Sequence, residues 1–150
     1  MFRPVFIYFT FIYFLFCDVQ AQMNLDELQK AYLNYVLECA VENSVTPDDL
    51  EELKNLKMPD KENVRCLFAC AYKKAGMMND KGELFIEGVQ EITKKYFSDN
   101  PEKMKYSEQF IQACESVNDA PVSDSKKGCD RAALIFKCGV ENVPDFEFIV

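Results

Sequence analysis

The sequence predicts an all-α domain, and three observations lead to this fold class. Apolar residues recur at three- and four-residue steps over most of the chain, whereas the strict alternation typical of strands is essentially absent. Proline, glycine and short polar side chains occur where such helices would begin and end. Once the first segment is set aside, the cysteines are even in number, which indicates a small secreted domain held by three disulfides.

The first segment, residues 1–21, is typical of a secretory signal peptide. Arg3 gives it a basic start, residues 5–16 are almost wholly apolar, and small residues ending at Ala21 precede the expected cleavage site. The alternative, a membrane anchor, is disfavoured because the apolar run is shorter than the ~20 residues that span a bilayer. We therefore expect a secreted domain of residues 22–150 without stable membrane insertion.

Three helices are expected in the first half of this domain. The first spans about 25–42, where apolar side chains recur on one face. A short second helix begins at Thr46, whose hydroxyl group suits a helix cap, and runs to about Leu56. The third begins at Asp60 and ends at Gly76, a residue type that favours the left-handed conformation after a helix.

Three more helices are expected in the second half. The fourth has its apolar face along 85–96, and the fifth begins at the start signal Asn100-Pro101. The polar segment 118–127 is expected to be a surface loop. The sixth helix spans about 128–138 and is apolar on nearly all sides, which indicates a helix buried in the middle of the domain.

The cysteine spacing restricts the disulfides. Cys66 and Cys70 are four residues apart on one helix, so their Cβ atoms would lie about 5–6 Å apart, too far for a disulfide. Cys129 and Cys138 face opposite sides of the sixth helix and are about 13 Å apart along its axis. Six cysteines allow fifteen pairings, and several of these remain open after the two pairs are excluded.

The gaps between the six cysteines carry a family resemblance. From Cys39 to Cys138 they read Cys-x26-Cys-x3-Cys-x43-Cys-x14-Cys-x8-Cys. This pattern resembles that of insect odorant-binding proteins, the pheromone- and general-odorant-binding family, of which the x3 and x8 gaps are the most specific marks. The resemblance implies a compact six-helix domain around a hydrophobic cavity, interlocked by three disulfides. The implied pairs are Cys39–Cys70, Cys66–Cys129 and Cys114–Cys138.

The resemblance also implies a ligand pocket among the third to sixth helices. Leu134, five residues past the fifth cysteine, matches a position that lines the cavity in relatives. Phe148 lies in the apolar tail 139–150, which closes the pocket in relatives with a C-terminus of medium length. We expect this tail to fold over the pocket, so that its residues are buried.

The remaining candidate ligand contacts come from the residues themselves. Helical periodicity turns some side chains inward, a thioether adapts to irregular ligands at an entrance, and a tyrosine hydroxyl suits a ligand oxygen. For each of them ordinary core packing is the alternative interpretation. These candidates are Tyr72, Met77, Met78, Val89, Ile92, Tyr106 and Phe110.

By resemblance, the chain is expected to be a secreted carrier. Such a protein binds and solubilises small hydrophobic volatile ligands, odorants or pheromones, and delivers them through sensillar lymph or another body fluid. The alternative is a non-olfactory carrier, or a salivary or venom interaction protein, on the same scaffold. A homodimer and a relation to a chemoreceptor are further partners that the resemblance raises, whereas the net charge of −8 disfavours nucleic acid.

An enzyme is not expected, and neither is a cofactor or a metal. The chain has no histidine, which excludes Ser-His-Asp and Cys-His catalysis and metal sites built on histidine. No spacing of carboxylates indicates a catalytic pair. Without histidine, any acid-driven release of a ligand must use carboxylates, which titrate near pH ~4.

Overall fold

The computed structural model describes residues 27–124 and 127–143, and within these ranges it contains helices and no strand. In chain order they are the N-terminal helix (27–42), the 3-10 helix η1 (Pro47–Asn55), α2 (Glu62–Ala75), α3 (Ile86–Phe97), α4 (Pro101–Cys114), the 3-10 helix η2 (Glu115–Asp119) and α5 (Cys129–Asn142). The predicted all-α fold class is confirmed. The signal peptide predicted for residues 1–21 lies outside the described ranges.

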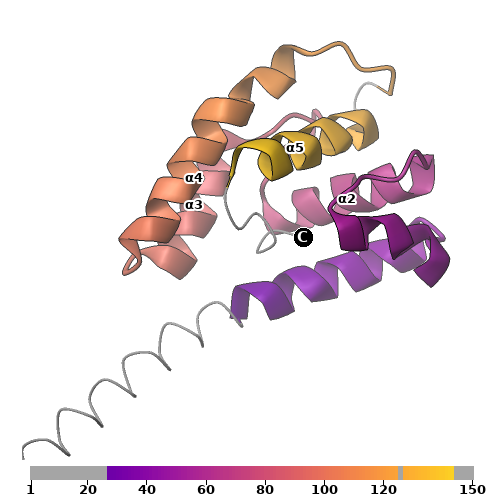
Figure 1. Cartoon of the computed structure of the whole chain (residues 1–150), viewed down its shortest axis with the longest axis horizontal. Coiled ribbons are helices and arrows are strands. Elements are labelled where there is room, and N and C mark those ends of the chain that lie inside the picture. Colours follow the sequence, from indigo (N-terminus) through magenta and orange to yellow (C-terminus); the bar gives the residue numbers. More distant parts are fainter. Residues whose placement is uncertain (1–26, 125–126, 144–150) are drawn as a thin grey trace, which may run out of the picture.

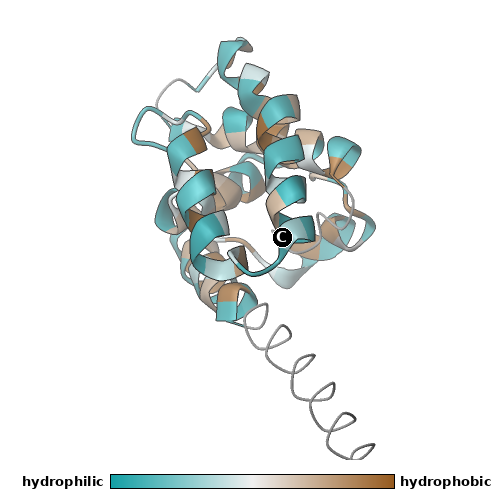
Figure 2. Ribbon diagram, turned by 90° about the vertical axis from the view of Figure 1, so that its left-hand side faces the viewer, coloured by the Kyte–Doolittle hydropathy of each residue, from teal (hydrophilic) through white to brown (hydrophobic). Residues whose placement is uncertain are grey.

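Helix α2 lies between α5 and the N-terminal helix, and α3 and α4 form a pair at one end of this group (Figure 1). Helix α5 packs against α2 and α4, while α3 packs mainly against α4. Along each helix the ribbon alternates between hydrophilic and hydrophobic residues (Figure 2), as expected for amphipathic helices that turn one face to the interior.

The interface of α2 and α5 forms a filled core. The rings of Phe68 on α2 and Phe136 on α5 have their centroids 5.3 Å apart. Ala132 and Ile135 on α5 are fully buried, as is Leu67 on α2. The prediction that the sixth helix is buried in the middle of the domain is therefore confirmed only for the face that packs against α2, since Leu134 is half-buried and Lys137 is exposed.

Three disulfides join the helices. Cys39–Cys70 links the N-terminal helix to α2, Cys66–Cys129 links α2 to α5, and Cys114–Cys138 links α4 to α5. These are the pairs that the family resemblance implies. Because α2 and α5 each carry two bridged cysteines, these two helices form the centre of a covalent frame.

Helix η1 begins with a capping box. The Asp49 carboxylate accepts a hydrogen bond from the Thr46 backbone N–H (2.8 Å), while the Thr46 hydroxyl oxygen accepts one from the Asp49 N–H (3.4 Å). Asp60 does not cap the next helix, contrary to expectation. Its carboxylate accepts a hydrogen bond from Arg65 Nη1 at 2.7 Å, and Lys61 occupies the cap position of α2 without a side-chain bond.

Helix α5 continues to Asn142, past its expected end at Cys138. Gly139 is buried inside the helix, and the Asn142 side-chain amide donates a hydrogen bond to the Cys138 carbonyl (2.9 Å). The prediction of a tail from residue 139 is therefore wrong for its first residues, because the helix retains backbone hydrogen bonds there. Residues 144–150 lie outside the described ranges.

Candidate functional site

A cavity of about 340 Å³ lies between the N-terminal helix, α3 and α4. This volume falls within the range of about 300–1,000 Å³ found for small-molecule sites. Most of its lining side chains are aliphatic or aromatic. The lining residues are Leu28, Ala31, Tyr32, Tyr35, Ala75, Gly76, Met77, Phe85, Gly88, Val89, Glu91, Ile92, Thr93, Lys95, Tyr96, Phe97, Lys103, Tyr106, Ser107, Phe110 and Val143.

Two glycines bring α3 against the end of α2 and so set one wall of the cavity. Gly76 ends α2 with a φ of 80° in the left-handed region, and its N–H bonds to carbonyl groups of the last turn. The chain turns back through a hydrogen bond from the Phe85 N–H to the Met77 carbonyl (2.8 Å). A Cβ atom at Gly88 would overlap the Gly76 carbonyl oxygen, so only glycine permits this approach.

One polar pair crosses the apolar wall between α3 and α4. Thr93 Oγ1 lies 2.7 Å from Ser107 Oγ and also donates a hydrogen bond to the Val89 carbonyl oxygen at 2.8 Å. Thr93 is buried, with 7% of its surface exposed, and both side chains line the cavity. The pair is therefore a polar feature inside a mainly apolar site.

Charged side chains lie at the outer edge of the cavity. Glu91 and Lys95 are exposed and Lys103 is half-buried. The Lys95 ammonium lies 4.7 Å from the centre of the Tyr96 ring, and Lys103 Nζ lies 5.5 Å from that of Tyr106. Because these charges remain near water, the inner part of the site suits an uncharged ligand.

Two buried tyrosines lie close to each other, Tyr32 on the N-terminal helix and Tyr72 on α2. Tyr32 lines the cavity, whereas Tyr72 is fully buried in α2 outside the cavity lining. Among the described residues neither hydroxyl group has a hydrogen-bond partner. Burial raises the pKa of both phenols, and for Tyr72 the nearby Tyr32 raises the pKa further. Both tyrosines are therefore neutral, and Tyr72 contributes to the core.

The structure brings most of the sequence-based candidates together at the cavity. Their placement follows from the faces of α3 and α4 that periodicity turns inward. Candidates that line the cavity are Met77, Val89, Ile92, Tyr106 and Phe110. Met78 and Tyr72 are buried outside the lining, Leu134 is half-buried on α5 outside it, and Phe148 lies beyond the described residues.

The cavity matches only part of the expected position of the pocket, among the third to sixth helices. Helix α5 turns its buried face to α2, so Leu134 does not reach the cavity lining. The N-terminal helix supplies the missing wall through Leu28, Ala31, Tyr32 and Tyr35. In the sequence these residues show only as the apolar face of a helix, which does not distinguish the wall of a cavity from a filled core.

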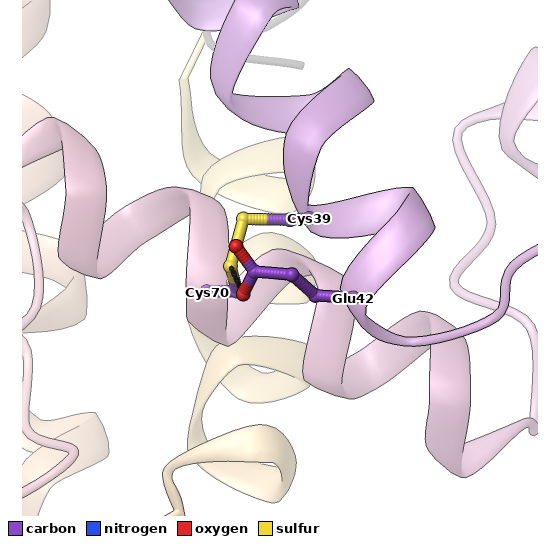
Figure 3. A group of neighbouring side chains, drawn as sticks. All are labelled: Cys39, Glu42 and Cys70. Atoms are coloured by element: carbon purple, nitrogen blue, oxygen red, sulfur yellow. Dashed lines mark hydrogen bonds between the residues drawn. A yellow bond between two sulfur atoms is a disulfide. The ribbon is translucent and has the colours of Figure 1, made fainter.

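A second group of potential ligand atoms lies at the Cys39–Cys70 disulfide. Glu42 Oε2 is 3.4 Å from Cys70 Sγ, and the carboxylate points at the sulfur atoms (Figure 3). Lys74 holds Glu42 in place through a 3.0 Å ion pair. A disulfide sulfur carries no proton and is not a thiolate, so these atoms do not form the donor set of a metal site.

None of the helices in the described ranges is long and apolar enough to span a membrane. Curated proteins with similar sequences are odorant-binding proteins. General odorant-binding protein 19d of Drosophila melanogaster is 28% identical over 108 residues, which cover 72% of this chain and 69% of that protein. Odorant-binding protein 10 of Aedes aegypti is 23% identical over 138 residues, covering 89% of each chain.

Solved structures share the fold. An odorant-binding protein of Drosophila melanogaster superposes with a TM-score of 0.59 at 23% identity, over 77% of this chain and 91% of that one. A pheromone-binding protein of the cockroach Leucophaea maderae, solved with the fluorescent reporter 1-anilinonaphthalene-8-sulfonic acid, gives a TM-score of 0.61 at 20% identity, over 77% and 95%. A sequence model of the PBP/GOBP family matches residues 21–142. The chain therefore belongs to the PBP/GOBP family.

Proposed function

We propose that this protein is a secreted carrier, which binds small hydrophobic ligands of the odorant or pheromone class and carries them through an extracellular fluid. The ligand occupies the cavity between the N-terminal helix, α3 and α4. The observation that carries this proposal is the cavity itself, an apolar space of about 340 Å³ inside a disulfide-linked frame. The role is binding and transport, without a catalytic step.

Family membership and the energetics of the fold support the proposal. An unfilled cavity lowers the stability of a protein because the residues around it lose packing partners, and this loss grows with the cavity volume. A small domain has only about 5–15 kcal/mol of net stability. The covalent frame offsets that loss, so the cavity persists and remains available to a ligand.

A probe titration tests the proposal. We expect 1-anilinonaphthalene-8-sulfonate, the reporter bound by the cockroach relative, to bind one-to-one and to be displaced by small volatile compounds. Ala31 lines the cavity and Ala113 is exposed on α4. Ala31→Phe fills part of the cavity and should weaken binding at least ten-fold, whereas Ala113→Phe adds the same ring outside it and should leave affinity unchanged.

Two results would contradict the carrier role. One is the absence of saturable binding by the wild-type protein. The other is an equal loss of affinity in Ala31→Phe and Ala113→Phe, which would show that the probe responds to unfolding rather than to this cavity. Far-UV circular dichroism of both variants separates these cases, since each keeps the helical content if the frame is intact.

The C-terminal tail remains a proposal of its own. We propose that residues 144–150 cover the cavity, because Val143, the last described residue before them, already belongs to its lining. A chain that ends at Val143 should release the probe faster than the full chain. Equal dissociation rates, measured by stopped-flow fluorescence, would end this idea while leaving the cavity as the binding site.

A further inference from the structure

The hydroxyl pair of Thr93 and Ser107 has a fixed number of protons to share. Each hydroxyl group has one proton and two lone pairs. Thr93 Oγ1 lies within hydrogen-bond distance of two acceptors, the Val89 carbonyl oxygen at 2.8 Å and Ser107 Oγ at 2.7 Å. The direction of each bond therefore decides what the pair can offer to a ligand.

One arrangement makes two internal hydrogen bonds. If Thr93 donates to the Val89 carbonyl oxygen, Ser107 donates its proton to Thr93, and both protons are used. If Thr93 instead donates to Ser107, the Ser107 proton has no partner among the described residues and one internal bond is lost. The first arrangement is favoured, because it makes two internal hydrogen bonds and the second arrangement makes only one.

We infer that the cavity selects uncharged ligands that donate a hydrogen bond, such as alcohols and phenols, over ligands of equal size that only accept one. In the favoured arrangement Ser107 Oγ has committed its proton and offers free lone pairs to the cavity that it lines. An alcohol donates to Ser107 without disturbing the pair. This inference rests on the proposed carrier function and specifies the ligand class.

A ketone or an ether of the same size meets a different situation. At this pair, its oxygen must either stay unpaired or take the Ser107 proton, which breaks the bond from Ser107 to Thr93. The Tyr32 hydroxyl group, which lines the cavity without a partner among the described residues, can donate to either ligand. At Ser107 the alcohol therefore makes one hydrogen bond more than the ketone makes. Because chains of hydrogen bonds strengthen one another, we expect a preference of about five- to ten-fold in affinity.

Competition with a matched pair of ligands tests the inference. The compounds 2-nonanol and 2-nonanone share one carbon skeleton and differ only in the oxygen group. Each displaces bound 1-anilinonaphthalene-8-sulfonate from the wild type and the variants, and the ratio of their affinities is compared between proteins. Differences in hydration of the two ligands cancel in this comparison, because the water phase is the same for every protein.

Three variants test whether the preference depends on which hydroxyl group of the pair donates, or only on the presence of a polar side chain. Ser107→Ala should reduce the alcohol preference about five- to ten-fold. Thr93→Val keeps the branched shape but removes the acceptor of the Ser107 proton, so the ratio should shift toward 2-nonanone. Ser116→Ala, on the exposed side of η2 and outside the cavity, is the matched control and should keep the wild-type ratio.

Each result supports or overturns one statement. An unchanged ratio in Ser107→Ala, with the probe still bound, overturns the donor preference but leaves the carrier role intact. A shift toward the alcohol in Thr93→Val overturns the assigned direction of the protons. If the probe does not bind the folded wild type at all, the carrier proposal falls first, and the ligand class falls with it.

Discussion

Two regions of the molecule use similar helices but differ in how their interiors are filled. In the first, which we call the filled side, α2 and α5 pack through Phe68 and Phe136, and the apolar side chains at their interface are fully or almost fully buried. In the second, the hollow side, the N-terminal helix, α3 and α4 surround the cavity, and side chains such as Ile92 and Phe97 are only half-buried.

The disulfides follow the same division. Helices α2 and α5 each carry two bridged cysteines, α4 and the N-terminal helix carry one each, and α3 carries none. Helix α3 is therefore held by packing and by the close approach of Gly88 to Gly76, without a covalent link. The difference teaches that stability is concentrated on the filled side, while the hollow side can adapt to a ligand.

The largest expected effect comes from removing the bridge at the centre of the filled side. Replacing both Cys66 and Cys129 by serine opens a loop with a sequence separation of 63 and should lower the free energy of unfolding by about 4 kcal/mol. Urea denaturation without reductant measures this value. The matched pair Cys114→Ser with Cys138→Ser, with a separation of 24, should lose somewhat less, about 3.5 kcal/mol.

The reverse order would show that the hollow side depends more on its covalent link than the filled side does. That result would contradict the division into a filled and a hollow side, because the second bridge joins α4, a helix that lines the cavity, to α5.

A smaller effect is expected where the hollow side is joined to α2. Gly88→Ala places a methyl group against the Gly76 carbonyl group, so α3 must move away from α2, at an expected loss of about 2–3 kcal/mol in unfolding free energy. Ligand affinity should fall as well, since Gly88 lines the cavity. Gln90→Ala, exposed on the same helix, should change neither quantity by more than about 0.5 kcal/mol.

A stable Gly88→Ala protein with unchanged affinity would show that the cavity does not depend on this contact. Thermal unfolding measures the stability of each variant, and probe titration of the same samples measures its ligand affinity.

The filled side and the hollow side also differ in how much of their structure the sequence predicts. The filled side was predictable for two reasons. Consecutive apolar residues in the sequence of α5 indicate its buried face, and the gaps between the cysteines resemble a family pattern that implies the three disulfides. The inward faces of α3 and α4 were predictable from helical periodicity, which placed Val89, Ile92 and Phe110 at the cavity.

The other wall of the cavity was not predictable in this way. Periodicity shows which face of the N-terminal helix is apolar, but it does not show whether that face meets a filled core or a space. Tyr32 and Tyr35 therefore could not be told from core residues, and Gly88 gives no sign in the sequence that its Cβ position is occupied by the Gly76 carbonyl group.

A finer comparison removes one methyl group from each region. Ile135 on α5 is fully buried, whereas Ile92 on α3 is half-buried and faces the cavity. Ile135→Val should lower the free energy of unfolding by about 1 kcal/mol. Ile92→Val should cost less than about 0.5 kcal/mol, because the removed atoms already lack neighbours on one side. Equal losses in denaturant titrations would mean that the cavity wall is packed as tightly as the core.

The smallest effect concerns the electrostatics of η1, at the edge of the filled side. The Lys61 ammonium and the Thr46 N–H and hydroxyl groups hold the pKa of Asp49 below its usual value. A lowered pKa in the folded state means that the ionised carboxylate stabilises the protein above pH ~4, and that this contribution is lost as the pH falls further. Asp49→Asn should therefore lower the urea midpoint slightly at pH 6–7, and the difference from wild type should shrink toward pH 3.

Ligand binding should respond differently from stability over the same range of pH. The chain has no histidine, so no side chain with an ordinary pKa changes its charge between pH 7 and pH 6, and probe affinity should stay constant there. For the urea measurements on Asp49→Asn, the control is Asp48→Asn, which removes an exposed carboxylate beside Asp49. A sharp fall of affinity between pH 7 and pH 6, with an unchanged urea midpoint, would mean that a group on the hollow side titrates there, and that this side is sensitive to acid while the filled side is not.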